Sequence, residues 1–518
     1  MEQRLISISK LFNMMNKLKN IEKQIVITTL IIGLPLYFDN GYFNMLEAKR
    51  EFFVLLFVIH FILISIFSLF SESPSNEDKT FRITAVDISL IVFLLVCLFG
   101  GLRSGDIKSA LLGNEGTGLG MLFWNLCVML YFYIRYEKTD SLRIITIMFI
   151  AADIVFAVGA VNLFGLDPFG ILSPLTGRDI GKYISTIGNI NWYAGYCCII
   201  TTLATIMFLK SKNDIKEVLY FVTMTAGIFQ SVTCSSDCAL VGLFVVGTII
   251  LIHIVTGKDV VKNGIVMLTV SIILLIIAVL NNEFNLYYPL VGLQLMITAG
   301  PVVIGSALIG ILHIILGRFK VRKVNIKNIN IFGTFVTVFT LVVMLMCYKE
   351  QLVQPIKEYM EFNDSWGTNR GYIWRYSIKI FDRADMDRKL IGSGPDSFGS
   401  MASKYYYDEL YVHFGKRLVN AHNQFLQLLI TTGIVGCVAY YTAVVGAIVK
   451  GIVSGGEKST IRLALAVSLL AVTLQGVFNN FMTLDCVMIM ILMALCGTGD
   501  GSSFQFWNEE PSPVSETP

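Results

Sequence analysis

The chain has 518 residues, of which 55% are hydrophobic and 15% charged, and its mean hydropathy is +0.68. Soluble globular proteins carry about 25% charged residues, so this composition excludes that class and predicts a polytopic membrane protein. The formal net charge of +3 is too small to indicate a nucleic-acid partner.

Apolar segments follow one another with short breaks from residue 25 to 348 and again from 425 to 496. A membrane core needs roughly 20 apolar residues per helix, which predicts an all-α chain with about 14 transmembrane helices (about 12 to 14). We expect four parts in order: spans 1 to 11 in residues 1–348, the last two centred near residues 302 and 339; one large extracytoplasmic loop in residues 349–422; spans 12 to 14 in residues 423–498; and a disordered cytoplasmic tail in residues 499–518.

Lysine and arginine predict the orientation of the chain. With the N-terminus inside, the inner segments carry 23 of these residues and the short outer loops carry 6. Positively charged loops resist translocation, and long loops are exempt from the rule. The count therefore predicts that both termini lie inside and that the loop 349–422 lies outside.

The outer loop contains the sequence W-G-T-N-R-G-Y-I-W-R-Y-S, which begins at Trp366. Apolar residues follow a helical period from Arg370 to Asp382, which predicts a helix lying along the membrane surface. Arg370 and Arg375 are about one and a half turns apart, so their guanidinium groups point to different sides, and only one is expected to face a site. In a second interpretation, these arginines only meet lipid phosphates.

Two further patterns in the loop exclude some kinds of site. G-S-G-P-D-S-F, from Gly392, lacks the G-K-[ST] ending of a phosphate loop, so Gly392 and Gly394 predict a tight turn that lets the backbone approach a ligand or a neighbouring helix. Asp385 and Asp387 form a D-x-D sequence, which metal-dependent transferases use to bind nucleotide sugars. Nucleotide sugars are not supplied on the outer face. We therefore expect neither a metal nor a cofactor.

Amide side chains surround His422 where the chain re-enters the membrane. Asn420, Asn423, Gln424 and Gln427 lie within about two helical turns of it, at a place where polar groups are costly unless they are used. A structural, hydrogen-bonded histidine is the alternative.

A second outer candidate runs from Arg178 to the start of the sixth predicted span, where Asn189 and Asn191 stand. An asparagine commonly caps a helix N-terminus. A cap accounts for one of these asparagines and not for both.

Together these patterns resemble the membrane O-antigen ligase and polysaccharide polymerase superfamily. The family pattern is an N-x-N-like motif, an R-x-x-x-W helix, a G-x-G-x-x-x-F turn and an H-N-x-x-L-Q-x-x-x-x-x-G-x-x-G stretch. The matching residues are Asn189, Asn191, Arg370, Trp374, Gly392, Gly394, Phe398, His422, Asn423, Leu426, Gln427, Gly433 and Gly436. The chain departs from the pattern at Asp237, where many members have arginine, and Arg178 and Lys182 compete for an upstream arginine's place.

The resemblance implies a lipid-sugar glycosyltransferase (GT-C-like) fold in the bacterial plasma membrane, with the active site facing outside. The donor would be a polyprenyl-pyrophosphate-linked glycan, and the acceptor a sugar hydroxyl on a glycan or glycolipid among the membrane lipids. The implied catalytic residues are Arg370, which would hold the diphosphate without a metal, and His422, which would act as the base or orient the pyrophosphate. The implied substrate-binding residues are Arg178, Asn189, Asn191, Arg375, Gly392, Gly394, Asn423 and Gln427.

A transport function is the alternative from another class. Asp153, in the fifth predicted span, is an intramembrane carboxylate of the kind that proton coupling uses. The chain could then be a multi-span secondary transporter or a glycan or lipid flippase. Neither internal repeats nor a midplane site are visible in the sequence to favour it.

Overall fold

The computed structural model describes residues 2–42, 44–69, 83–113, 117–136, 140–212, 215–255, 259–284, 286–288, eight positions between 305 and 315, 361–454 and 459–497. The predicted span centred near residue 339, most of the one centred near residue 302 and the predicted tail 499–518 lie outside the described residues. The other predicted spans each fall within a described helix.

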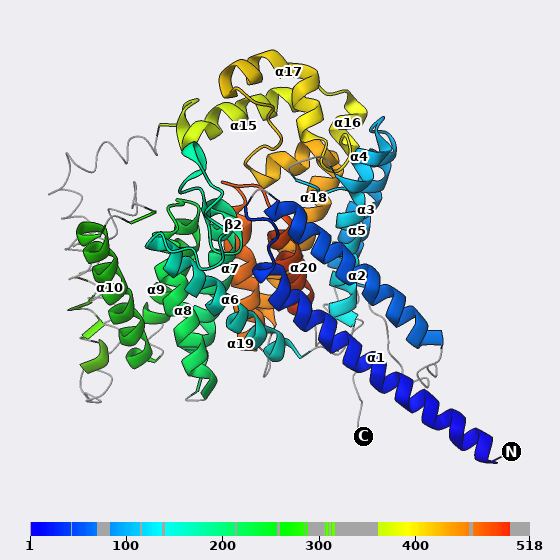
Figure 1. Cartoon of the computed structure of the whole chain (residues 1–518), viewed down its shortest axis with the longest axis horizontal. Helices are drawn as coiled ribbons and strands as arrows, with labels where there is room; N and C mark the ends of the chain where they lie inside the picture. Colours follow the sequence, from blue (N-terminus) through cyan, green and yellow to red (C-terminus); the bar gives the residue numbers. More distant parts are fainter. Residues whose placement is uncertain are drawn as a thin grey trace, which may run out of the picture.

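Most of the described chain is helical (Figure 1). The helices of the bundle are α1 (Glu2–Leu36), α2 (Met45–Leu69), α3 (Ala85–Leu102), α5 (Met121–Tyr136), α6 (Ser141–Leu163), α7 (Ile190–Lys210), α8 (Ile215–Thr233), α9 (Ala239–Val255), α10 (Val260–Glu283), α18 (Gln424–Val453), α19 (Ser459–Gln475) and α20 (Thr483–Gly497). In the described part, six of these helices are long and apolar enough to cross a membrane, and four more are apolar but shorter. The helical membrane class is therefore confirmed, whereas the total of about 14 spans and the GT-C-like fold stay predictions.

Short elements connect or cover these helices. They are α4 (Ile107–Leu112), the 3-10 helix η1 (Gly177–Asp179), the strands β1 (Tyr183–Ile184) and β2 (Gly188–Asn189), and the helices α15 (Trp366–Arg383), α16 (Met386–Ile391) and α17 (Phe398–Phe414). The two strands pair antiparallel, with Tyr183 opposite Asn189. This small hairpin is an exception to the predicted all-α chain, and it leads directly into the start of α7.

Residues 361–423, with α15, α16 and α17, form a cap over one end of the helical bundle (Figure 1). Loops from distant parts of the chain meet the cap at this end. Arg103 pairs with Asp387, and the ring of Trp366 lies 6.2 Å from that of Phe478. We call this the cap end of the bundle, and the opposite end the far end.

The cap has a small hydrophobic core of its own. Ile373, Ile380 and Phe398 are buried in it and pack with residues of α17. This cluster also includes Ala421 and Ile430, which flank the start of α18. The cap core therefore fixes the position of the segment that carries His422.

Backbone contacts bind the cap turn to the kinked part of α18. Gly433 interrupts the helical conformation of α18 with φ 66° and ψ −174°, and Gly394 N donates to Thr431 O at 3.0 Å. A Cβ atom on Gly392 would collide with the carbonyl oxygen of Thr431, and one on Gly433 would lie 2.5 Å from Gly392 N. Of the two partners predicted for this turn, the structure provides the neighbouring helix.

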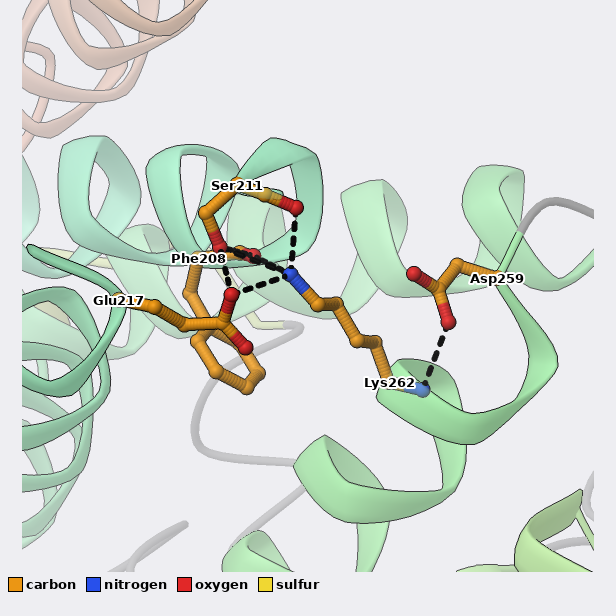
Figure 2. A network of polar contacts seen from close by, with 5 residues as sticks. All are labelled: Phe208, Ser211, Glu217, Asp259 and Lys262. Atoms are coloured by element: carbon orange, nitrogen blue, oxygen red, sulfur yellow. Dashed lines mark hydrogen bonds and ion pairs between the residues drawn. The ribbon is translucent and has the colours of Figure 1, made fainter. Parts of the chain in front are cut away.

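At the far end, a buried lysine joins three helices (Figure 2). Lys262 Nζ donates to the backbone oxygens of Phe208 at 3.1 Å and Ser211 at 2.7 Å, to Ser211 Oγ at 2.8 Å and to Glu217 Oε2 at 3.0 Å. Asp259 Oδ1 accepts from Lys262 N at 3.2 Å and so caps α10. The end of α7, the start of α8 and the start of α10 are thereby held together.

Candidate functional site

Arg370 stands at the first regular turn of α15, after an unusual backbone segment. Gly367, Thr368 and Asn369 all have positive φ, at 59°, 59° and 70°. This conformation is an outlier for a β-branched residue such as Thr368, and such strain gathers at functional sites. The left-handed turn carries the chain across to Arg370, whose Nη1 donates to Gly367 O at 2.9 Å.

The guanidinium group of Arg370 points toward the bundle. Its Nη2 lies 3.8 Å from Cys238 Sγ, in the loop between α8 and α9. Its Nε is buried and has no hydrogen-bond partner, and no carboxylate among the described residues pairs with it. A half-buried guanidinium without an anion is well placed to receive one, because its own charge has been only partly compensated.

His422 lies close enough to Arg370 to be influenced by its charge. Burial first, then the positive charges of Arg370 and Lys416, lower the pKa of His422 from 6.5 to about 4. Its Nδ1 is buried without a hydrogen-bond partner, and its backbone has φ 46°. The side chain is therefore a neutral imidazole whose Nδ1 makes no hydrogen bond.

The predicted amide side chains hold the backbone around His422. Asn420 Oδ1 accepts from His422 N at 3.1 Å, and Gln427 Oε1 accepts from Ala421 N at 2.9 Å. Asn423 Oδ1 caps α18 by accepting from Leu426 N at 3.0 Å. Gln424 Oε1 accepts from Phe481 N at 2.9 Å. These contacts position His422, and the substrate contacts predicted for Asn423 and Gln427 stay predictions.

The two asparagines at the start of α7 have different partners. Asn189 Oδ1 accepts from Asn191 N at 2.9 Å and caps the helix. Asn191 Oδ1 accepts from Ser236 Oγ at 2.7 Å, and Asn191 O accepts from Gln475 Nε2 at 3.2 Å. Because Ser236 and Cys238 belong to the same short loop, Asn191 connects through it to Arg370.

The remaining predicted residues lie away from this centre or outside the description. Arg375 Nη2 pairs with Asp364 Oδ2 at 2.7 Å, with both side chains about half exposed, so it does not share the environment of Arg370. Arg178 belongs to η1 by its backbone, and its side chain is outside what the structure describes. The substrate contacts predicted for both arginines, and for Gly392 and Gly394, are untested.

Sequence reasoning missed Ser236, Cys238 and Gln475 as neighbours of the site. The segment T-C-S-S-D-C was singled out only for Asp237, which replaces an expected arginine. Burial raises the pKa of the Cys238 thiol, and Arg370 opposes this shift. Cys238 is thus a neutral, polarisable neighbour of the guanidinium group.

The described residues offer no group of three or more His, Cys, Asp and Glu side chains that could hold a metal ion. In the D-x-D sequence, Asp387 pairs with Arg103. Metal-independent action stays a prediction, with the guanidinium group of Arg370 as the cation at this centre.

The fold and the site together define a helical membrane protein that carries a cationic and imidazole-containing site at the cap end of its bundle. Residues 287–441 match the profile of a protein family described as O-Antigen ligase. The motifs from residue 366 to 436 lie inside this match, so the resemblance to the O-antigen ligase and polymerase superfamily is confirmed. No curated protein matches the chain.

Proposed function

We propose that the chain transfers a glycan from a polyprenyl-pyrophosphate carrier to a sugar hydroxyl of an acceptor, on the outer leaflet of a bacterial plasma membrane. The proposal rests on the closeness of Arg370 to His422. Arg370 has no carboxylate partner among the described residues, and the imidazole of His422 is neutral. The family match supports transfer of this general kind.

The proposed reaction breaks the bond between the anomeric carbon of the donor sugar and the carrier phosphate oxygen. The acceptor hydroxyl oxygen forms the new bond to that carbon, and its proton passes to a ring nitrogen of His422. The electron pair of the broken bond leaves with the diphosphate. The guanidinium group of Arg370 stabilises the added negative charge through paired hydrogen bonds.

The low pKa of His422 fits this sequence of events. Burial and the charge of Arg370 disfavour a second positive charge, so the imidazole is neutral and can accept a proton. A bound diphosphate neutralises Arg370 and favours the imidazolium form. The base would therefore become stronger when the donor is in place, which couples donor binding to activation of the acceptor.

A reconstituted system tests the reaction and separates it from transport. The purified chain would be placed in liposomes with a synthetic polyprenyl-pyrophosphate glycan and a soluble glycan acceptor. We expect a lengthened acceptor and an equal amount of released polyprenyl pyrophosphate. Movement of the intact donor across the bilayer without any new glycosidic bond would replace the proposal with the flippase alternative. The carboxylate to test in that case is Asp153, which accepts a hydrogen bond from Thr223 Oγ1 at 3.1 Å.

Single cysteines test which side the cap faces. Ser365 is exposed in the cap and Lys212 is exposed at the far end, while the native cysteines of the described chain are buried. A membrane-impermeant thiol reagent should label Ser365→Cys in intact cells, and Lys212→Cys only after lysis. The reverse pattern would place the site inside the cell.

A further inference from the structure

Two cavities at the cap end are each partly lined by α4, apart from the Arg370 and His422 site. The first has a volume of about 380 Å³ and is lined by residues that include Lys108, Asp396 and Arg417. The second has a volume of about 270 Å³ and is lined by residues that include Ser393 and Arg388. Ser109 lines both cavities, so they adjoin. Neither lining includes Arg370 or His422.

The first cavity presents two cations from separate parts of the chain. Lys108 belongs to α4, and Arg417 to the segment between α17 and α18. Neither side chain forms a hydrogen bond or ion pair with the described residues, and both are exposed to the cavity and solvent. Asp396 is the carboxylate in this lining and is already held by the hydroxyl group of Thr117. Among the described lining residues, positive charge is therefore in excess.

The turn from Gly392 to Phe398 supplies polar groups to the linings of both cavities. Asp396 has φ 59°, a strained conformation that its contact with Thr117 maintains. Ser393 is 8% exposed, and its Oγ is buried without a hydrogen-bond partner. A buried hydroxyl without a partner costs free energy, and Ser393 belongs to the lining of the second cavity. Tight packing explains the glycines of the turn, but it does not explain Ser393.

The chemistry of the linings selects one class of ligand. A volume of about 380 Å³ falls in the range of small-molecule sites, roughly 300 to 1,000 Å³, and is large for a bare anion. Serine hydroxyls, carboxylates and cations in the second cavity offer both donors and acceptors, as sugar hydroxyls require. The two unpaired cations of the first cavity fit a carboxylate or phosphate substituent.

We propose that these adjoining cavities form a saccharide subsite that takes a sugar with an acidic substituent, held by Lys108 and Arg417, on the glycan whose other end reacts at His422. This inference rests on the proposed glycan transfer. Arg417 and His422 are five residues apart, so their Cα atoms are at most about 18 Å from each other. A glycan can span that distance with a few sugar rings.

Direct binding to the purified full-length chain tests the subsite without relying on transfer. The probes are digalacturonate, the neutral disaccharide cellobiose and inorganic phosphate, each titrated by calorimetry against the His422→Gln variant in detergent. We expect digalacturonate to bind at least about tenfold more tightly than cellobiose, since hydrogen bonds between charged groups are the strong ones. Its binding should weaken as salt concentration rises.

Variants assign the binding to the cavity. The double variant Lys108→Gln/Arg417→Gln should lose at least about tenfold in affinity for digalacturonate. Lys379→Gln removes an exposed cation of α15 that lines neither cavity and should bind normally. Since all three positions are exposed, thermal unfolding should be unchanged in these variants.

Three results would overturn the inference. They are equal affinity for cellobiose and digalacturonate, unchanged binding by the double variant, or displacement of digalacturonate by phosphate at equal concentration, which would indicate a simple anion site. A wild-type chain that binds digalacturonate but forms no glycosidic bond would keep the subsite and refute the proposed transfer. A chain that transfers glycans but binds no acidic sugar would refute the subsite and keep the proposed transfer.

Discussion

Two cationic side chains at opposite ends of the bundle, Lys262 and Arg370, have different hydrogen-bond partners. At the far end, four oxygens lie within 3.1 Å of Lys262 Nζ, including one from the carboxylate of Glu217. At the cap end, Arg370 has no carboxylate partner among the described residues, and both Arg370 Nε and His422 Nδ1 are buried without a hydrogen bond. The first arrangement is complete in itself, and the second is not.

The difference separates a structural role from a ligand-binding one. A buried polar atom without a partner costs about 1 to 3 kcal/mol, so such atoms call for an explanation. The Lys262 network needs no ligand, because its hydrogen-bonding capacity is used. The Arg370 and His422 pair sits beside strained backbone and keeps capacity for an anion and a proton, as a site awaiting substrate does.

The largest effect is expected from removing the imidazole at the cap end. His422→Ala should lower the rate of glycan transfer by about 10² to 10⁴, the usual range for loss of a general base. The protein should still accumulate in the membrane, because the hydrogen bonds of this segment come from backbone and amide groups. The measurement is product formation at matched membrane levels.

A matched histidine makes that result specific. His413 is exposed in the cap and stacks on Tyr372 with a centroid distance of 3.9 Å, so His413→Ala should keep near-normal transfer. Equal rates for wild type and His422→Ala would mean that the imidazole only completes the fold.

The next effect separates the two arginines of α15. Arg370→Lys keeps the charge but loses the paired hydrogen bonds of a guanidinium group, and transfer should fall by about 10² or more. Arg375→Lys should retain most activity, because Arg375 pairs with the exposed Asp364. Initial rates over a range of donor concentration would show whether the loss falls on kcat or on KM. Similar losses in both variants would contradict the assignment of Arg370 alone.

A third prediction concerns the far end, where stability rather than transfer should respond. Lys262→Met removes the more buried partner of an ion pair, and the free energy of unfolding should fall by about 2 to 3 kcal/mol. The correctly folded fraction should transfer glycan at the normal rate. Thermal unfolding in detergent and activity per folded molecule are the measurements.

Lys182→Met is the control for that variant. Lys182 pairs with Asp179 across 3.4 Å, with both side chains about half exposed. Such surface pairs contribute about 0 to 1 kcal/mol, so this change should scarcely alter unfolding. If Lys182→Met destabilised the chain as much as Lys262→Met, burial would not be what distinguishes the two networks.

Local sequence patterns were enough to predict the helix around Arg370, the different surroundings of Arg370 and Arg375, and the polar start of α18. Helical periodicity carries this information because it relates residues a few positions apart. The contacts of Arg370 with Cys238, and of Asn191 with Ser236 and Gln475, join residues 132, 45 and 284 positions apart. No local pattern encodes such pairs.

The roles of the amide side chains near His422 could not be predicted from the sequence either. Their number near His422 suggested a site, yet Asn420, Asn423 and Gln427 each use their oxygen atom to hold nearby backbone. Sequence alone could not separate a group that binds substrate from one that positions its neighbour. Only the hydrogen-bond partners make that distinction.

The smallest predicted effect is a shift along the pH axis, and it tests whether Arg370 and His422 act as a pair. Burial and Arg370 lower the pKa of His422 to about 4, so the free protein keeps the imidazole neutral well below pH 6.5. The acid limb of kcat/KM, which reports the free enzyme, should therefore lie near pH 4. Bound diphosphate offsets the charge of Arg370, so the acid limb of kcat should lie at higher pH than that of kcat/KM. The lowered pKa of His422 also makes stability depend on pH. The unfolded chain takes up a proton at His422 below about pH 6.5, and the folded chain does not. The free energy of unfolding therefore falls as the pH drops toward 4 and then levels off. His422→Gln should flatten that slope. Acid limbs of kcat and kcat/KM that coincide near pH 6.5 would show that the imidazole does not sense the guanidinium group, and the cap end would then lose the coupling that sets it apart from the far end.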